Sequence, residues 1–193
     1  MEKNLSHLIF ILDRSGSMGG VEDETIKGYN SVIEQQAKMD GEVIEDSALF
    51  DNFIEEIFCE EKPENAKLDH NKYYVRGSTA MLDAIGMTLS KAIEKNNKLN
   101  QEEKPQNVIV AITTDGYENA SREYSFKQVN DMIKRCKKQG WNFIFLSADI
   151  DEQKVGKSIG LTGDDIMPRF RKTTNGMAKM SECLCSRISD LRG

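Results

Sequence analysis

Five oxygen-bearing side chains have the types and the spacing to hold a metal ion. They occur in three separate segments of the chain and are Asp13, Ser15, Ser17, Thr79 and Asp115. Gly16, between the two serines, permits the tight turn that would bring the oxygens of the first segment to one point. Carboxylate and hydroxyl oxygens are hard ligands, so the set suits Mg²⁺ or Mn²⁺, with Ca²⁺ as a further option, rather than zinc or copper.

The charge of this set indicates what such a metal ion would do. Two carboxylates and three neutral hydroxyls balance a divalent cation. If one aspartate acts through a water, the cation keeps an open coordination position, which a carboxylate from outside can fill. The sequence places no candidate base, acid or activated nucleophile beside the set. We therefore expect a non-catalytic module, not an enzyme, that binds an acidic group of a partner protein.

The elements that must position these residues alternate along the chain. Continuous apolar runs, which predict strands buried on both faces, lie at 7–12, 107–113 and 141–147. Apolar residues at helical spacing predict helices over 21–39, 80–96 and 125–139. This alternation is typical of a mostly parallel sheet with helices on both faces. Ligands bind such sheets outside the carboxyl ends of the strands, where Asp13 and Asp115 are expected.

Shorter elements fill the remaining segments. The turn signal Asp51-Asn52 predicts that strands at 47–51 and 53–59 form an antiparallel pair. Ser78 or Thr79 is the expected N-cap of the helix that follows. A helix at 152–159, a strand at 166–170 and a helix at 174–191 complete the predicted elements. No repeat or linker divides the chain, so residues 1–193 are expected to form a single domain.

In their order along the chain, the five residues resemble the metal-ion-dependent adhesion site of von Willebrand factor type A (vWA) domains. The resemblance covers nearly the whole chain and includes the segments Gly77-Ser78-Thr79 and Thr114-Asp115-Gly116. It implies a three-layer, doubly wound, Rossmann-like α/β fold whose mostly parallel six-stranded sheet has one antiparallel edge strand and helices on both faces. It also implies that Ser15, Ser17 and Thr79 contact the metal directly, whereas Asp13 and Asp115 often act through waters.

Composition and charge limit the partners and the cellular location that we expect for the protein. The 193 residues carry a net charge of −6 without a basic block, which favours neither nucleic acid nor anionic membranes as a partner. The apolar runs are too short to span a bilayer or to act as a signal peptide, and the four cysteines show no CxxC spacing. We expect a cytoplasmic protein that looks like the stand-alone intracellular vWA domains of bacteria and phages. Its oligomeric state does not follow from the sequence.

Other interpretations fit parts of the sequence. Asp13 after the first strand also resembles the nucleophile of Mg²⁺-dependent phosphotransferases of the haloacid dehalogenase type, but that family needs a second acid where Ser15 stands. A structural domain whose metal only stabilises loops would need the same ligands, and Asp13 with its serines alone could be a capped turn. Arg14 is expected to face solvent, where it could steer an acidic partner, and Tyr117 and Glu118 are expected at the rim of the site.

Overall fold

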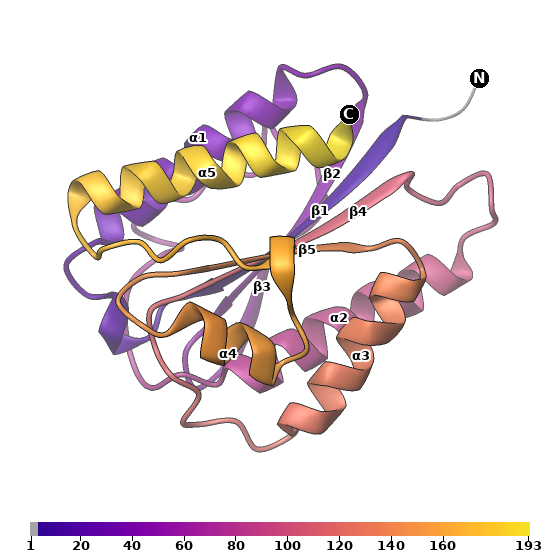
Figure 1. Ribbon diagram of the computed structural model, residues 1–193. Coiled ribbons are helices and arrows are strands. Elements are labelled where there is room, and N and C mark those ends of the chain that lie inside the picture. The colour runs from indigo at the N-terminus through magenta and orange to yellow at the C-terminus, as the bar shows by residue number, and fades with distance from the viewer. Residues whose placement is uncertain (1–3) are drawn as a thin grey trace.

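The computed structural model describes residues 4–193, and these form three layers (Figure 1). Helices α1 (Glu22–Ala37) and α5 (Thr174–Arg192) cover one face of a central sheet. Helices α2 (Met81–Lys98) and α3 (Phe126–Lys138) cover the other face, and the shorter α4 (Glu152–Ser158) packs in the same layer. Each face of the sheet therefore has its own hydrophobic core, as in other α/β domains.

Within the described residues the sheet has five strands in the order β3-β2-β1-β4-β5. The strands are β1 Leu5–Asp13, β2 Glu42–Phe50, β3 Ile54–Glu61, β4 Asn107–Thr114 and β5 Asn142–Ser147. β1 pairs in parallel with both β2 and β4, β4 pairs in parallel with β5, and β3 is an antiparallel edge strand. The predicted mostly parallel sheet with one antiparallel edge strand is confirmed.

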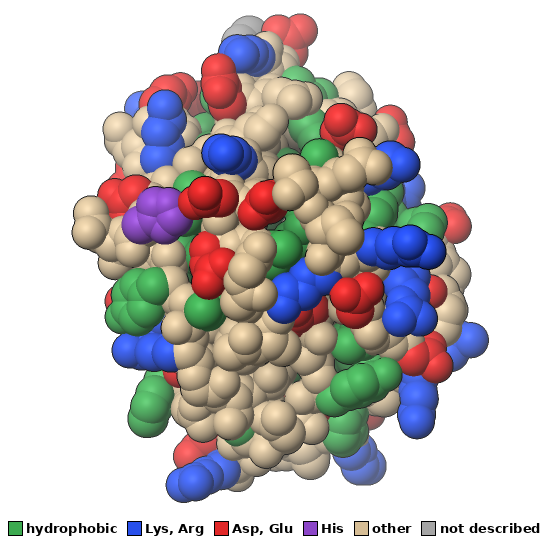
Figure 2. Space-filling view, turned by 90° about the vertical axis from the view of Figure 1, so that its left-hand side faces the viewer, with side chains coloured by type: hydrophobic (Ala, Val, Ile, Leu, Met, Phe, Trp, Pro, Cys, Tyr) green, Lys and Arg blue, Asp and Glu red, His purple; other side chains and the backbone are tan. Residues whose placement is uncertain are grey.

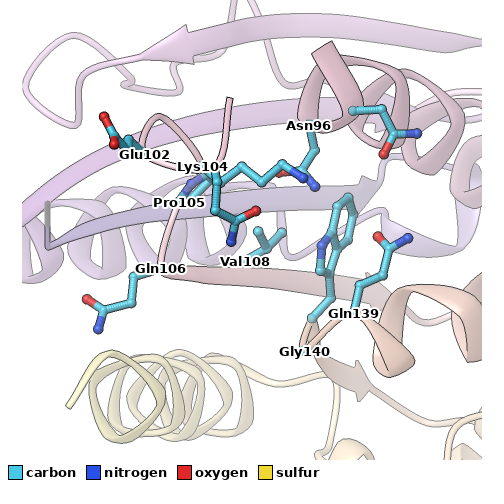
Figure 3. A pocket seen from close by; sticks show the side chains of 11 residues that line it. Asn96, Glu102, Lys104, Pro105, Gln106, Val108, Gln139 and Gly140 are labelled. Carbon is cyan, nitrogen blue, oxygen red and sulfur yellow. The ribbon is translucent and has the colours of Figure 1, made fainter. Parts of the chain in front are cut away.

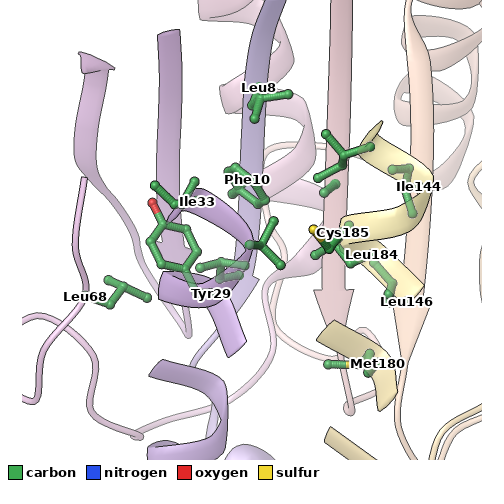
Figure 4. Packing of buried hydrophobic residues seen from close by; sticks show 14 of the residues in the cluster. Leu8, Phe10, Tyr29, Ile33, Leu68, Ile144, Leu146, Met180, Leu184 and Cys185 are labelled. Atoms are coloured by element: carbon green, nitrogen blue, oxygen red, sulfur yellow. The ribbon is translucent and has the colours of Figure 1, made fainter. Parts of the chain in front are cut away.

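Side-chain alternation along β1 explains why an unbroken apolar run forms a strand. Phe10 and Leu12 point toward the layer of α1 and α5, whereas Ile9 and Ile11 point toward the layer of α2 and α3. The ring of Phe10 meets Tyr29 of α1 edge to face, with the ring centroids 5.3 Å apart (Figure 4). Because both sides of the strand are covered, residues 8–12 are apolar on both sides, and this part of the sequence shows no period of two.

The prediction of a sixth strand at 166–170 is wrong in its extent. This segment runs beside β5 but contacts it only through two isolated parallel bridges, Ile166 with Phe145 and Phe170 with Ala148. Two hydrogen bonds lead from its amides to β5, from Met167 to the carbonyl of Phe145 (2.9 Å) and from Phe170 to that of Ser147 (3.2 Å). The two donors are three residues apart whereas their acceptors are two apart, so the segment loses the regular register of a parallel ladder between Met167 and Phe170.

The helices follow the predicted pattern, but the start of α2 differs in its cap. Ala80 occupies the N-cap position, so the expectation that Ser78 or Thr79 caps this helix is wrong. The backbone N–H of Leu82 in the first turn is bound instead by the carboxylate of Glu118, 2.8 Å away. This arrangement leaves the hydroxyl of Thr79 free to face the loop after β1.

The helices and the cysteines bear on the expectations about membranes and disulfide bonds. Across residues 4–193, the helices lack the combination of length and apolar character that a membrane span requires. The four cysteines, all within this range, are free thiols.

A buried glutamate, Glu45, lies between the sheet and α1. The side chain of Glu45 on β2 is fully buried and accepts hydrogen bonds from the hydroxyls of Tyr29 (2.9 Å) and Ser47 (2.7 Å). Burial raises the pKa of Glu45 to about 8, although these two hydrogen bonds favour the charged form. Glu45 is therefore protonated in the folded protein at neutral pH, whereas in the unfolded chain it is ionised.

We predict that Glu45 makes the protein less stable as the pH rises. Between the ordinary glutamate pKa and about 8, the folded state binds one proton more than the unfolded state, so the free energy of unfolding falls with increasing pH. The slope from one proton is at most about 1.4 kcal/mol per pH unit. In Glu45→Gln this contribution disappears, so the variant should match the wild type at pH 5 and exceed it in stability at pH 8.

Urea unfolding at pH 5, 6.5 and 8 measures this difference. The exposed Glu102 provides the matched control, because Glu102→Gln removes the same charge at the surface. A stability difference between wild type and Glu45→Gln that stays constant with pH would show that Glu45 does not change its protonation on folding.

Candidate metal centre

Three loops meet at the carboxyl ends of β1 and β4, the edge of the sheet that faces the viewer in Figure 2. The loop after β1 contains a short 3-10 turn, η1 (Gly16–Met18), and is joined to the loop before α2 by a hydrogen bond from the amide of Gly16 to the carbonyl of Gly77 (3.0 Å). The loop after β4 is joined to the same segment from the other side, because the amide of Asn119 donates to the carbonyl of Thr79 (3.1 Å). The fold therefore brings the three predicted segments together.

The three hydroxyl groups of the candidate site form one hydrogen-bonded group. The Oγ atoms of Ser15 and Ser17 lie 3.0 Å apart, and Thr79 Oγ1 donates to Ser15 Oγ over 3.1 Å. Gly116 in the loop after β4 packs directly against this group. A Cβ atom at Gly116 would lie 2.7 Å from Thr79 Oγ1 and 3.0 Å from Ser17 Oγ. A side chain at this position would therefore fill the space around the hydroxyls.

Asp13 lies behind the hydroxyls and is completely buried. Its Oδ1 accepts a hydrogen bond from the amide of Ser15 (2.7 Å), and its Oδ2 accepts one from the hydroxyl of Thr114 (2.6 Å). Burial raises the pKa of Asp13, and the nearby Asp115 carboxylate acts in the same direction, while the two hydrogen bonds oppose the shift. A positive charge beside Asp13 would stabilise its charged form.

Asp115 is the second buried carboxylate of the site, with a side chain only 3% exposed. Its Oδ1 atom is buried without a hydrogen-bond partner among the described residues. Its Oδ2 atom lies 3.3 Å from the ammonium group of Lys172, which also donates to the backbone carbonyl of Ser17. A buried carboxylate oxygen without a partner is costly, and a bound cation would relieve that cost.

The donor set fits a hard divalent cation. It consists of one unpartnered carboxylate oxygen, a second carboxylate and three neighbouring hydroxyls, all oxygen donors. Over residues 4–193, the structure contains no cluster of three or more His, Cys, Asp or Glu side chains with the geometry of a metal site. Any metal bound at this edge of the sheet would therefore depend on the serine and threonine hydroxyls.

The expectation that Arg14 faces solvent is wrong. Its side chain is completely buried, and its Nε atom donates to Asp51 Oδ2 over 2.9 Å. Asp51 is shared with Arg76, whose Nε lies 2.7 Å from the same oxygen, and Arg14 Nη2 lies 2.7 Å from the carboxylate of Glu55. Arg14 also stacks on Tyr74, 5.3 Å from the ring centroid. Arg14 therefore anchors the loop after β1 to the turn between β2 and β3, and it does not reach toward a partner.

Two further residues, Tyr73 and Asn119, hold the site in place and were not identified from the sequence. Tyr73 is completely buried, and its hydroxyl donates to the backbone carbonyl of Asp13 over 2.7 Å. Asn119 accepts a hydrogen bond from the amide of Thr79 (2.9 Å) through its side chain. Glu118, expected at the rim, is half-buried, and its carboxylate accepts a hydrogen bond from the amide of Leu82 at the start of α2. Tyr117 is 54% exposed beside Asp115, as expected for a rim residue.

A large pocket lies at the opposite edge of the sheet, near the amino ends of β4 and β5 (Figure 3). Its volume is about 1140 Å³, and its lining is mostly polar, with side chains such as Asn96, Lys104, Gln139 and Trp141. None of the five candidate residues lines it. The pocket is therefore separate from the candidate metal centre.

Comparisons with known proteins identify the fold. Neither a protein family nor a curated protein matches the sequence. Among solved structures, proximal thread matrix protein 1 from the mussel byssus is 14% identical with a TM-score of 0.61, and the match covers 95% of this chain and 46% of that one. This chain therefore spans about half the length of the mussel protein. Another structure of that protein is described as having a zinc-occupied MIDAS motif (TM-score 0.57).

Two further structures extend the likeness. Manganese-loaded TRAP protein of Plasmodium vivax is 17% identical with a TM-score of 0.59, and the match covers 93% of this chain and 73% of that one. The SpRpn10 VWA domain is 11% identical with a TM-score of 0.59, and here the match covers 91% of this chain and 93% of that one. At such low identity these similarities concern the fold. The chain has the fold of a von Willebrand factor type A domain.

Proposed function

We propose that this protein is a non-catalytic protein-binding module that holds a divalent cation through Asp13, Ser15, Ser17, Thr79 and Asp115. The cation would bind an acidic group, an aspartate or glutamate side chain, of a partner protein. The observation that carries this proposal is the buried Asp115 Oδ1 atom without a partner, next to three hydroxyls that hydrogen-bond to one another.

The roles of the five residues follow from their surroundings. The hydroxyls of Ser15, Ser17 and Thr79 would contact the metal directly, because they are neutral and already grouped. Asp13, whose two oxygens are both held by hydrogen bonds, would act through water. A metal with few anionic ligands is a strong Lewis acid, and it supplies the positive charge that attracts a partner carboxylate.

The choice of metal rests on the ligand chemistry. An all-oxygen set with two carboxylates favours Mg²⁺, or Mn²⁺ in its place, with Ca²⁺ as a further candidate. The structural neighbours support a divalent cation of some kind, since one is described as loaded with manganese and another as having zinc in its MIDAS motif.

Exposed aromatic side chains near the site support a protein as the partner. Phe53 is 71% exposed in the turn between β2 and β3, and Tyr117 is 54% exposed in the loop after β4. Tyr74, whose ring contacts the guanidinium groups of both Arg14 and Arg76, is also exposed. In Figure 2, charged side chains of both signs lie in the middle of this face, and hydrophobic side chains lie toward its margins. Aromatic residues are enriched at protein–protein interfaces.

The phosphotransferase alternative is disfavoured by the surroundings of Asp13. A nucleophilic aspartate must present an oxygen to its substrate. Asp13 is completely buried, and each of its oxygens is engaged by a hydrogen bond. The position of the second acid that such an enzyme needs is occupied by Ser15, whose hydroxyl bonds to Thr79 and Ser17.

We predict that the protein, stripped with EDTA, becomes more stable when Mg²⁺ or Mn²⁺ is added back. A hundredfold excess of metal over its Kd raises the free energy of unfolding by about 2.7 kcal/mol. For a chain of this length, that corresponds to a rise in Tm of roughly 5–10 °C. In Thr79→Val, which removes one hydroxyl ligand, and in Asp115→Asn, which removes one charge, the apparent metal affinity should fall at least about tenfold, or 1.4 kcal/mol.

Thr174→Val is the matched control for the loss of a threonine hydroxyl. Thr174 bonds to Glu24 at the start of α5 and is not one of the proposed ligands. Thermal melts over a metal titration give the affinities of all four proteins. Equal metal responses in wild type and Thr79→Val would place any bound metal elsewhere.

The partner chemistry is tested by selecting peptides from a random displayed library in Mn²⁺ and again in EDTA. We expect peptides that bind only with the metal to contain an aspartate or glutamate that cannot be replaced by asparagine or glutamine. Peptides selected equally well in EDTA would contradict a metal-mediated contact. Hydrolysis of p-nitrophenyl phosphate that is lost in Asp13→Asn would instead favour the phosphotransferase.

A further inference from the structure

Lys172 is the basic residue that enters the candidate metal centre. It lies in the segment between the β5-bridging stretch and α5, and its side chain is only 22% exposed. Its ammonium group lies 3.3 Å from Asp115 Oδ2 and donates to the backbone carbonyl of Ser17. It therefore contacts two of the five residues proposed to hold the cation, one through its side chain and one through its backbone.

The contact with Lys172 offsets part of the negative charge of the site. Asp13 and Asp115 are both buried carboxylates of this site, and like charges repel strongly where water is scarce. Within residues 4–193, the ion pair with Lys172 is the one that involves a member of the five-residue set. A single ammonium charge offsets one of the two carboxylates, whereas a divalent cation would offset both.

The segment that carries Lys172 is fixed on both sides of this residue. The amide of Phe170 donates to the carbonyl of Ser147 on β5 (3.2 Å), and the carbonyl of Phe170 accepts from the amide of Asp149 (3.2 Å). Thr173 caps α5 by accepting a hydrogen bond from the amide of Gly176 (3.1 Å). The backbone thus presents the lysine side chain to the site, and the contact does not depend on a freely moving chain end.

We propose that Lys172 is an internal counter-ion of the metal centre, which a divalent cation must displace in order to bind. This inference rests on the proposed function, because it concerns the same site. A metal ion in contact with Ser17 Oγ and close to Asp115 would lie within a few ångströms of the ammonium group, where two positive charges repel strongly. Metal binding would then release Lys172 from Asp115 and loosen the segment before α5.

The test compares binding of Mn²⁺ alone to four proteins by isothermal titration calorimetry. Lys172→Met keeps the length of the side chain and removes its charge, so it should bind Mn²⁺ about tenfold more tightly than the wild type. Lys172→Arg keeps the charge and should not gain affinity. Lys179→Met removes the same charge from an exposed position of α5 and should bind as the wild type does. Hydrogen exchange supplies a second measurement, in which Mn²⁺ should reduce the protection of amides 170–173 in the wild type.

The outcomes separate this inference from the proposed function. If wild type binds Mn²⁺ and Lys172→Met binds it no more tightly, Lys172 does not compete with the metal, although the metal site stands. If Lys179→Met gains as much affinity as Lys172→Met, the effect is one of net charge, and the specific contact is overturned. If neither the wild type nor Lys172→Met binds Mn²⁺, both the metal site and its counter-ion are overturned. Binding by Lys172→Met alone would support the competition most directly.

Discussion

Parallel pairing of β1 with β4 forces two carboxylates together where water is scarce. Asp13 ends β1 and Asp115 follows β4, and both side chains are buried. Like charges that are close together in a buried position repel each other and cost stability unless something offsets them. Much of the local structure provides that offset, through the amide of Ser15, the hydroxyl of Thr114 and the ammonium group of Lys172. The vWA fold supplies the geometry that creates this need for positive charge.

Much of the architecture could be predicted because its determinants are local in the sequence. Strands covered on both faces need unbroken apolar runs, and the helices that cover them need apolar residues at a period of 3.6. The resemblance to vWA domains then placed the five oxygen-bearing residues at one edge of the sheet, and the three loops do meet there. That they bind a metal remains a proposal.

The errors concern contacts between residues that are distant in the sequence. Arg14 was expected in solvent, but Asp51, 37 residues away in the sequence, pairs with its guanidinium group after the chain has folded. Lys172 gave no signal either, since a lone lysine before a helix is usually a surface residue. The sixth strand also failed, because the segment 166–170 loses the regular register of the ladder between Met167 and Phe170 and keeps only two isolated bridges.

The contacts of the loop after β4 have a mechanical consequence. Asn119 exchanges hydrogen bonds with both the amide and the carbonyl of Thr79, Glu118 binds Leu82, and Asp83 accepts from three consecutive amides that begin at Arg122. These hydrogen bonds join the start of α2 and the connection from β4 toward α3 into one hydrogen-bonded unit. Thr79 belongs to that unit and Asp115 lies on the same connection just before it, whereas the two serines lie on the loop after β1. Substitutions in 118–123, where no proposed ligand lies, can thus change the spacing of the site.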